Sequence, residues 1–292
     1  MAESIIKYSV IIPHYNSLDV LPRAVDSVPD REDIEVLIVD NSTVPIDTHW
    51  FTDRRNVQIL YSPSGKGAGA ARNIGLENAK GKWLLFLDAD DFFTPEAFEV
   101  FDTHVHSEGD IVFYKTCSSY SDTLKSSNRH IGFNQLIDNY LSTGEDEKLR
   151  YEWSSPWGKM IKRSLVETNH ILFEETQAAN DVMFSLYTSY NASKVSAFDD
   201  VVYCITTHEG SLTMTPSIEN LTDRIDVFCR FNKTVHRHNH PDYQKSIMFY
   251  IYMAYKYHGF CTAFKLLCHS IRLGNNPFIG FRRWRKTANN LK

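Results

Sequence analysis

Short apolar segments alternate with amphipathic ones along the first hundred residues. Four of the apolar runs, at residues 8–12, 34–39, 57–61 and 82–87, are rich in β-branched or aromatic residues and are followed at once by polar or turn-forming residues. Such runs are typical of buried parallel strands. The stretches between them place apolar residues at helical spacing. We therefore predict an α/β fold with a mostly parallel sheet flanked by helices.

The pattern loosens after residue 95, where a helix is expected to start, and becomes helical towards the C-terminus. Further strands are predicted at 110–114, 158–161 and 201–205, and another helix begins at Asp181. Beyond about residue 217, helical spacing predicts helices over 218–236, 243–257 and 261–272. The chain is accordingly expected to form one larger domain over residues 1–215 and a helical region over 216–292.

The composition is that of a globular protein, with 42% hydrophobic and 13% aromatic residues. The five cysteines are odd in number and form no CxxC pair, which argues against a disulfide framework and favours a reducing compartment. We expect no signal peptide, and no apolar run reaches the roughly 18 residues that a membrane span requires. Residues 221–292 carry 13 Lys and Arg against 3 Asp and Glu, whereas residues 1–220 carry 18 against 33.

Ligands of parallel α/β sheets bind beyond the carboxyl ends of the strands. In this chain those ends are followed by residues 13–16, 40–42, 62–69 and 88–91. Two of these four segments contain carboxylates. The site is therefore expected at this edge of the sheet.

Three carboxylates emerge within four residues, at Asp88, Asp90 and Asp91, where the fourth strand ends. Such charges repel one another unless a cation lies among them. Mg²⁺ or Mn²⁺ fits, because it takes one or two protein carboxylates and completes its shell with phosphate oxygens and water. We expect that metal at Asp88 and Asp90. The alternative is an acidic loop that solvates the sheet edge and caps the next helix.

A glycine-rich segment, residues 65–73, leads into a helix with an Arg near its start. Small residues let a ligand approach the backbone, and a helix start favours anions. The segment is not a Walker loop, and it follows the third strand rather than the first, as a Rossmann fingerprint would. By itself it is also compatible with an ordinary loop. In residues 13–16, Tyr15 offers a ring against which a base can stack.

Taken together, these segments resemble the family 2 glycosyltransferases of the GT-A fold. The first strand ends in a Pro-x-Tyr-Asn-like segment at 13–16, and the second ends in an Asp followed by Ser and Thr at 40–43. A Gly-x-x-x-Ala-Arg-Asn-x-Gly segment covers 67–75, and Leu-Asp-x-Asp-Asp covers 87–91. The resemblance implies a GT-A catalytic domain over 1–215. Residues 1–100 would be its nucleotide-sugar-binding half and residues 101–215 its acceptor half.

The resemblance also implies roles for single residues. Asp40 and Arg72 would hold the uracil of a UDP-sugar, with Pro13 and Tyr15 lining that site. Asp88 would face the ribose or a metal-bound water. Asp90 would bind the metal cofactor, Mn²⁺ or Mg²⁺, with Asp88 as a second ligand.

The second half of the chain is similar to the same family in three segments. Residues 156–161 resemble the Trp-x-Lys strand of capsule and lipopolysaccharide enzymes, and Trp157 would stack on an acceptor sugar or belong to the core. Residues 180–184 resemble the Glu-Asp-x-x-Phe segment that carries the catalytic base, although the usual Glu is Asn180 here. His208 lies in the segment that would close the site, as a metal or phosphate ligand or as a structural residue.

Inversion needs one base that takes the proton of the acceptor hydroxyl. Asp181 is expected to be that base. Two alternatives remain: Asp181 is only a helix N-cap, or the base is Glu174 or Glu175.

The basic C-terminal tail interleaves Phe278, Phe281 and Trp284 with Arg282, Arg283, Arg285 and Lys286. This pattern suits an interfacial segment on an anionic membrane, or else a solvated helix end. Charge would also permit RNA, but we see no nucleic-acid-binding motif and expect no such partner. A cytoplasmic protein, peripheral at the inner face of the cell membrane, is the expectation.

The sequence therefore predicts an inverting, metal-dependent glycosyltransferase. It would move a sugar from a UDP-sugar to a glycan or polyprenyl-linked acceptor in surface polysaccharide synthesis. One alternative is a catalytically inactive module that binds nucleotide-sugars or glycans on the same fold. Another is a nucleotidyltransferase, but that enzyme would require a glycine-rich loop after the first strand.

Overall fold

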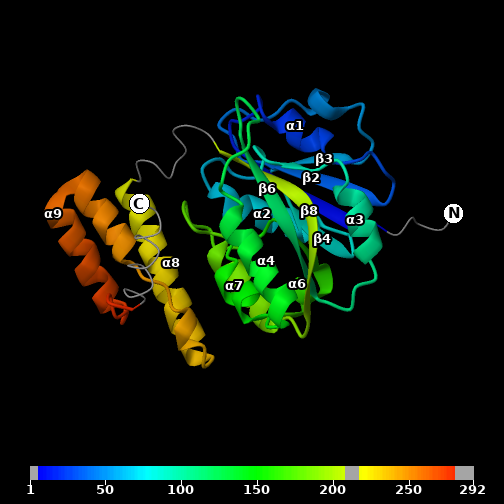
Figure 1. The fold of residues 1–292 in the computed structure, drawn as a ribbon. Coiled ribbons are helices and arrows are strands. Elements are labelled where there is room, and N and C mark those ends of the chain that lie inside the picture. Colours follow the sequence, from blue (N-terminus) through cyan, green and yellow to red (C-terminus); the bar gives the residue numbers. More distant parts are fainter. Residues whose placement is uncertain (1–5, 208–216, 280–292) are drawn as a thin grey trace. The chain divides into compact units, whose positions relative to one another are not determined.

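The chain divides into two compact units, which are described separately. A computed structural model describes residues 6–207 and 217–279 (Figure 1). The first unit comprises residues 1–175 and 184–209, and the second comprises 176–183 and 210–292. The predicted boundary between residues 215 and 216 falls in a stretch outside the described residues.

The first unit is built on one eight-stranded mixed sheet in the order β3-β2-β1-β4-β7-β6-β8-β5. Strands β3, β2, β1 and β4 run parallel, β7 is antiparallel to both β4 and β6, and β6 is parallel to β8. The short β5 pairs antiparallel with β8. The strands are β1 (Tyr8–His14), β2 (Ile34–Asp40), β3 (Val57–Tyr61), β4 (Trp83–Phe86), β5 (Phe92–Phe93), β6 (Ile111–Tyr120), β7 (Lys159–Lys162) and β8 (Val195–Thr207).

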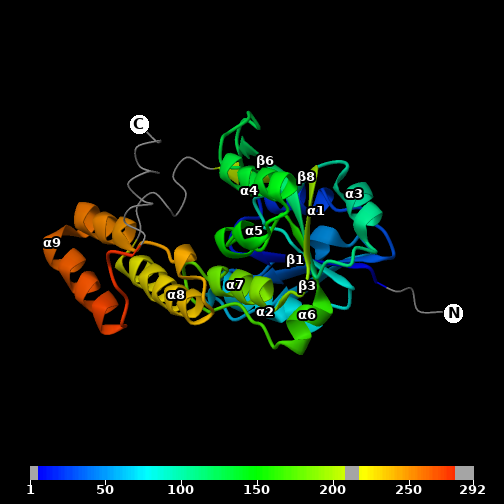
Figure 2. The same cartoon turned by 60° about the horizontal axis from the view of Figure 1, so that its bottom comes forward.

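Helices cover both faces of this sheet, and the predicted α/β architecture is confirmed. Figures 1 and 2 both show α3 and α4 on opposite sides of β8. Neighbouring residues of β6 explain the two layers, because Phe113 packs against Trp153 while Tyr114 packs against Phe101 of α3. The helices are α1 (Leu21–Asp26), α2 (Gly67–Asn78), α3 (Ala97–His104), α4 (Ile131–Thr143), α5 (Glu147–Glu152), α6 (Arg163–Thr168) and α7 (Val182–Asn191), with a 3-10 turn η1 (Thr48–Phe51).

The glycine-rich segment owes one of its glycines to close packing. A Cβ added to Gly75 would lie 2.4 Å from Cγ2 of Ile11 on β1. Real side-chain atoms do not approach that closely, so only glycine lets α2 lie on the strand. The end of the Ala-Arg-Asn-x-Gly segment therefore fixes the distance between α2 and β1, and with it the position of Arg72.

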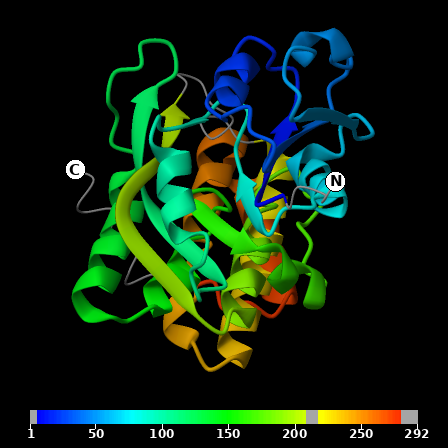
Figure 3. The same cartoon turned by 90° about the vertical axis from the view of Figure 1, so that its right-hand side faces the viewer.

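The structure adds elements that the apolar pattern did not predict. Helices α4, α5 and α6 were not expected, although α4 faces the core with Phe133, Leu136, Ile137 and Tyr140 at helical spacing. Strands β6 and β8 are longer than predicted, because they pair along their whole length through polar as well as apolar residues. Figure 3 shows the long, curved course of β8 in yellow-green.

The second unit contains helices α8 (Ile218–Arg237) and α9 (Met248–Arg272), with a 3-10 turn η2 (Pro241–Tyr243) between them. Ser217 caps α8 by accepting a hydrogen bond from the N–H of Asn220. Gly259 has φ 82° and divides α9 into two helical halves, in agreement with the two helices predicted there. Among the described residues, no helix is long and apolar enough to cross a membrane.

Candidate functional site

The carboxyl ends of β1, β2 and β4 meet at one edge of the first unit, because β1 lies between the other two strands and all three run parallel. His14 ends β1, Asp40 ends β2, and Asp88 follows β4. Residues far apart in the sequence are thereby gathered at the edge where α/β sheets bind ligands.

Asp40 is almost completely buried and is held by three donors. His14 Nδ1 lies 3.0 Å from its Oδ1, the N–H of Ser42 donates to the same oxygen over 3.1 Å, and the N–H of Ile46 donates to Oδ2 over 2.7 Å. Burial raises the pKa of this carboxyl, but the hydrogen bonds from Ser42, His14 and Ile46 outweigh it, so that the pKa lies below its usual range. Asp40 is thus an ionised acceptor in a fixed orientation.

The partners of His14 determine which of its nitrogens carries the proton. The N–H of Ser17 donates to Nε2 over 3.1 Å, so Nε2 is an acceptor without a proton. Nδ1 then carries the proton and donates to Asp40. His14 is a neutral positioning residue that orients the carboxylate, and it was not assigned a role from the sequence.

The loops after β1 and β2 are joined by hydrogen bonds. The N–H of Asn16 donates to Ser42 Oγ over 2.8 Å, and the N–H of Thr43 donates to Asn16 Oδ1 over 3.2 Å. Asn16 adopts φ 50°, a left-handed conformation that Asn tolerates better than most residues. Between these anchors Pro13 is half-buried and the Tyr15 side chain is exposed. Tyr15 therefore presents an exposed aromatic ring in the loop that follows β1.

Arg72 and Asn73 of α2 organise the centre of the site. The Arg72 guanidinium donates from Nη2 to Asp88 Oδ1 over 2.6 Å and lies 5.4 Å from the centroid of the Phe173 ring. Asn73 binds the backbone of Phe173 twice, donating to its carbonyl oxygen over 3.0 Å and accepting from its N–H over 2.8 Å. The Phe173 ring is stacked at 3.8 Å on Phe184. Arg72 is buried, with 7% of its side chain exposed, whereas 32% of the Asp88 side chain is exposed.

The three carboxylates after β4 have different environments. Asp88 and Asp90 are half-buried, whereas Asp91 is buried. Asp91 accepts hydrogen bonds of 2.7 Å from the Tyr203 hydroxyl and from the N–H of Thr206, both on β8. Asp91 is therefore a positioning residue that fastens the loop after β4 to β8, and only Asp88 and Asp90 have carboxylates at the surface.

The same loop is also held through its backbone. The Tyr203 hydroxyl accepts a hydrogen bond from the N–H of Asp88 over 3.2 Å. The carbonyl oxygen of Asp90 accepts from Arg23 Nη2 over 2.6 Å and from Thr206 Oγ1 over 2.8 Å. Arg23 of α1 lies 5.3 Å from the centroid of the Phe92 ring. Three residues outside the motif, Arg23, Tyr203 and Thr206, thus hold its backbone in place.

The electrostatics of this loop disfavour further negative charge. Burial is the main cause that raises the pKa of Asp91 well above its usual range, and the neighbouring charges of Asp90 and Asp88 add to it. Burial also raises the pKa of Tyr203. Its hydroxyl therefore stays protonated and donates a hydrogen bond to Asp91. Carboxylates that repel one another at a strand end are stabilised by a cation.

The donor set fits Mg²⁺ or Mn²⁺ bound together with phosphate. Within the described residues, no group of three or more His, Cys, Asp or Glu side chains is arranged to hold a metal without help. These ions commonly take one or two carboxylates from the protein, and diphosphate oxygens then complete their coordination shell. Asp90 and Asp88 are the residues that would hold the ion.

Three predicted site residues remain: Asp181, His208 and Trp157. Asp181 is half-buried and belongs to residues 176–183, which are part of the second unit. His208 lies outside the described residues. Trp157 is 5% exposed and stacks on Tyr203 at 5.4 Å, so its ring is part of the core, which was the alternative to an acceptor-binding role.

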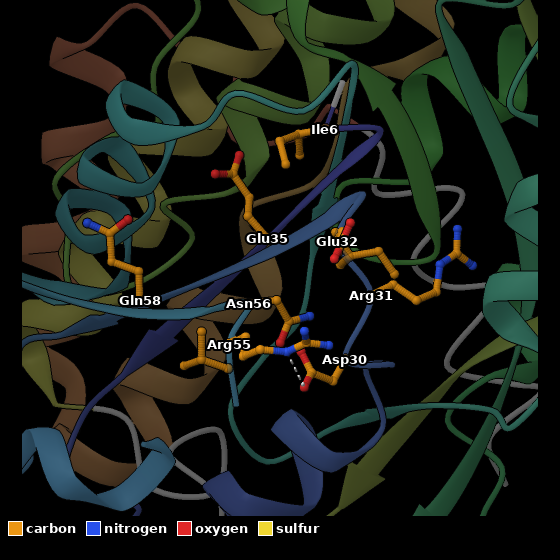
Figure 4. Close-up of a pocket in the computed structure, with 10 residues that line it drawn as sticks. Ile6, Asp30, Arg31, Glu32, Glu35, Arg55, Asn56 and Gln58 are labelled. Carbon is orange, nitrogen blue, oxygen red and sulfur yellow. Dashed lines mark ion pairs between the residues drawn. The ribbon is translucent and has the colours of Figure 1, made fainter. Parts of the chain in front are cut away.

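A cavity of about 420 Å³ lies at the opposite edge of the sheet, at the amino ends of β1, β2 and β3 (Figure 4). Both of its basic residues are paired with carboxylates. Arg55 lies 3.9 Å from Asp30, and Arg31 binds both Asp33 and Asp102. No strand ends with its carboxyl side here, and the cavity is therefore not the candidate site.

Comparisons with known proteins agree with this geometry. Residues 9–178 match the model of glycosyl transferase family 2. EpsH of Bacillus subtilis (strain 168), described as a glycosyltransferase, is 24% identical over 70% of this chain and 62% of its own length. The poly(ribitol-phosphate) beta-N-acetylglucosaminyltransferase TarS of Staphylococcus aureus (strain Mu50 / ATCC 700699) is 28% identical over 68% of this chain and 35% of its own length.

A solved structure shows the same fold. The crystal structure of residues 1–349 of S. aureus TarS in complex with UDP-GlcNAc has a TM-score of 0.62 and 23% identity, and covers 78% of this chain and 66% of that chain. The chain thus spans less than two thirds of EpsH and about a third of full-length TarS. The family model covers more than half of the chain, and its motifs occupy the carboxyl edge of a GT-A sheet. The chain belongs to glycosyl transferase family 2.

Proposed function

We propose that this protein is an inverting glycosyltransferase that moves a sugar from a UDP-sugar to a glycan or lipid-linked acceptor in surface polysaccharide synthesis. One observation carries the proposal. The Arg72–Asp88 ion pair of 2.6 Å lies at the same sheet edge as the fixed carboxylate of Asp40. TarS, whose described structures include complexes with UDP-GlcNAc and with UDP, has the same fold and supports a UDP-sugar as the donor.

The uracil would be recognised by Asp40 and Tyr15. Asp40 is an ionised acceptor whose carboxylate would take the ring N–H of uracil, whereas cytosine has no proton on that nitrogen. The exposed Tyr15 ring would stack on the base, and Arg72 would donate to the nucleotide from the other side.

The diphosphate would bind with Mg²⁺ or Mn²⁺ at Asp90 and Asp88. The ion would supply charge stabilisation for the departing diphosphate. Asp91, Tyr203, Thr206 and Arg23 would hold the two ligands in place, because they fix the backbone on both sides of the motif. Positioning of this kind keeps ligands within the tolerance that a metal site requires.

Asp181 would take the proton from the acceptor hydroxyl as its oxygen attacks the anomeric carbon. Asp181 directly precedes α7, in a segment that is attached to α8 by a hydrogen bond of 2.8 Å from the N–H of Gln177 to Asp223 Oδ2. The helical second unit thus carries the proposed base, while the first unit carries the proposed nucleotide site.

A panel of nucleotide-sugars tests the proposed donor. We expect the purified protein with Mn²⁺ to release the nucleotide slowly from UDP-sugars and not from CMP-, GDP- or ADP-sugars. Calorimetric titration of UDP tests the metal, and its affinity should fall when EDTA replaces Mn²⁺. Binding of UDP that is equal in EDTA would contradict the metal-dependent mechanism. Turnover of GDP-sugars in preference to UDP-sugars would contradict the role of Asp40.

A further inference from the structure

Helix α9 has an exposed aromatic side that the catalytic proposal does not use. In its second half, residues 260–272, the inner side is formed by Ala263, Leu266 and Ser270, which are buried. Phe260 and Phe264 are 70% and 55% exposed, and their stacked ring centroids lie 6.0 Å apart. The spacing of 4 residues places both rings on one side of the helix, next to the buried side rather than on it.

The stripe continues beyond these two rings. Ile271 is exposed and falls on the same side, since residues 4, 7 and 11 apart in a helix share a face. The first half of α9 also exposes aromatic rings, at Phe249, Tyr252 and Tyr255. Large apolar side chains that gather on one side of a helix mark a contact surface, whereas scattered ones do not.

The Lys and Arg residues of α9 are not matched by any Asp or Glu on the same helix, although Asp226 of α8 binds His269. Lys265 and Arg272 each follow a stripe residue directly, so both lie about 100° around the helix from it, on the same flank. Residues 243–292 contain nine Lys and Arg and no Asp or Glu. The aromatic side of α9 is therefore bordered by cations without a carboxylate on the same helix.

We propose that the exposed side of α9, centred on Phe260, Phe264 and Ile271, is a membrane-binding surface that inserts into the interfacial region of an anionic bilayer. Aromatic and aliphatic side chains flanked by Lys and Arg have the composition of helices that lie in the plane of a membrane. The cations match anionic headgroups. This surface is independent of the sugar-transfer site and does not rest on the proposed reaction.

Charge complementarity favours lipid over a second copy of the chain. In a symmetric dimer formed through this side, α9, which carries no Asp or Glu, would meet a second α9, and Lys265 and Arg272 would face like charges. Such pairs oppose association. An anionic bilayer, in contrast, offers negative charge and an apolar layer at the depth that the rings would reach.

Sedimentation with lipid vesicles tests the proposal on the full-length protein. We expect the wild type to bind vesicles of phosphatidylglycerol and phosphatidylcholine, and to bind pure phosphatidylcholine vesicles much more weakly. The double variant Phe260→Ser/Phe264→Ser should reduce partitioning at least about tenfold, since two large apolar side chains no longer enter the bilayer. Lys265→Gln/Arg272→Gln should reduce it by up to about 30-fold at low salt, and less at high salt.

The matched control is Leu172→Ser with Lys148→Gln in the first unit, because both side chains are exposed there. It should bind like the wild type. Circular dichroism melting of each variant checks that it is folded.

Two results would overturn the proposal. In one, the Phe260→Ser/Phe264→Ser variant binds vesicles normally while removal of the four charges of residues 282–286 abolishes binding, which assigns the anchor to the tail alone. In the other, sedimentation velocity shows a wild-type oligomer that the same variant dissociates, with no vesicle binding, which assigns the surface to a second copy.

Discussion

The two edges of the same sheet are both rich in charge, but the charges are arranged in opposite ways. At the amino edge, Arg31 donates four hydrogen bonds of 2.7 to 3.1 Å, two to Asp33 and two to Asp102. The hydrogen bond from Arg31 lowers the pKa of Asp33. At the carboxyl edge, burial and the charges of Asp90 and Asp88 raise the pKa of Asp91.

This difference separates charges that stabilise the fold from charges that are gathered for a ligand. At the amino edge Asp33 and Asp102 are paired with Arg31, and Asp30 lies 3.9 Å from Arg55, so these pairs are complete without a ligand. At the carboxyl edge Arg72 pairs with Asp88, but three neighbouring carboxyls are also held close together by Tyr203, Thr206 and Arg23, although their repulsion costs stability. Perturbed carboxyls of this kind in a ligand-binding position are typical of functional sites.

The largest expected effect is on sugar transfer, and it should occur when a carboxylate is removed at the carboxyl edge but not at the amino edge. Asp90→Asn removes a proposed metal ligand, and we expect sugar transfer to fall about a thousandfold, since a metal contributes several kcal/mol of charge stabilisation. The control Asp30→Asn changes a carboxylate at the amino edge and should leave turnover within about twofold. Equal losses in both variants, measured as kcat with a fixed acceptor, would remove the distinction between the edges.

The next prediction concerns the base in the second unit. Asp181→Asn keeps the size of the side chain but removes the proton acceptor, and transfer should fall about a hundredfold or more. The affinity for UDP, measured by calorimetry, should not change, because the base contacts the acceptor. Glu174→Gln and Glu175→Gln are the controls. If one of them abolishes transfer while Asp181→Asn remains active, the base is that glutamate.

Two arginines, Arg72 at the carboxyl edge and Arg31 at the amino edge, can be compared in both UDP affinity and stability. Arg72→Gln removes the charge-assisted hydrogen bond to Asp88, and the Kd for UDP should rise about tenfold or more. Arg31→Gln should leave the Kd for UDP unchanged and lower the free energy of unfolding by about 1 kcal/mol, the scale of a partly exposed ion pair. A change in UDP affinity caused by Arg31→Gln would show that the amino edge takes part in binding.

The smallest effect should depend on pH. The pKa of Asp33 is lower in the folded than in the unfolded protein, so its contribution to stability is present above the unfolded value of about 4. It is lost as the pH falls towards the folded value. The difference in unfolding free energy between the wild type and Arg31→Gln, measured in urea, should therefore shrink from pH 7 to pH 3. A difference that stays constant over this range would assign the effect of Arg31 to packing.

Much of the fold followed from local pattern. The four parallel strands, the helix after the glycine-rich segment and the two halves of α9 lie where apolar spacing placed them. Burial on both faces requires continuous apolar runs, and burial on one face of a helix requires spacing of 3 to 4 residues. Helix α4 was missed although Phe133, Leu136, Ile137 and Tyr140 carry the same helical spacing.

The sequence by itself determined which residues follow the strands, and thereby placed Asp40, Arg72, Asp88 and Asp90 at one edge of the sheet. Only the tertiary structure showed that Asp91 has a different role from Asp88 and Asp90. The donors that bind Asp91, on Tyr203 and Thr206, are more than 100 residues away in the sequence. These contacts depend on how β8 is aligned with β5 and β6, which no local pattern encodes. The same reason explains why His14 was missed: its role depends on the parallel pairing of β1 and β2, which brings Asp40 beside it.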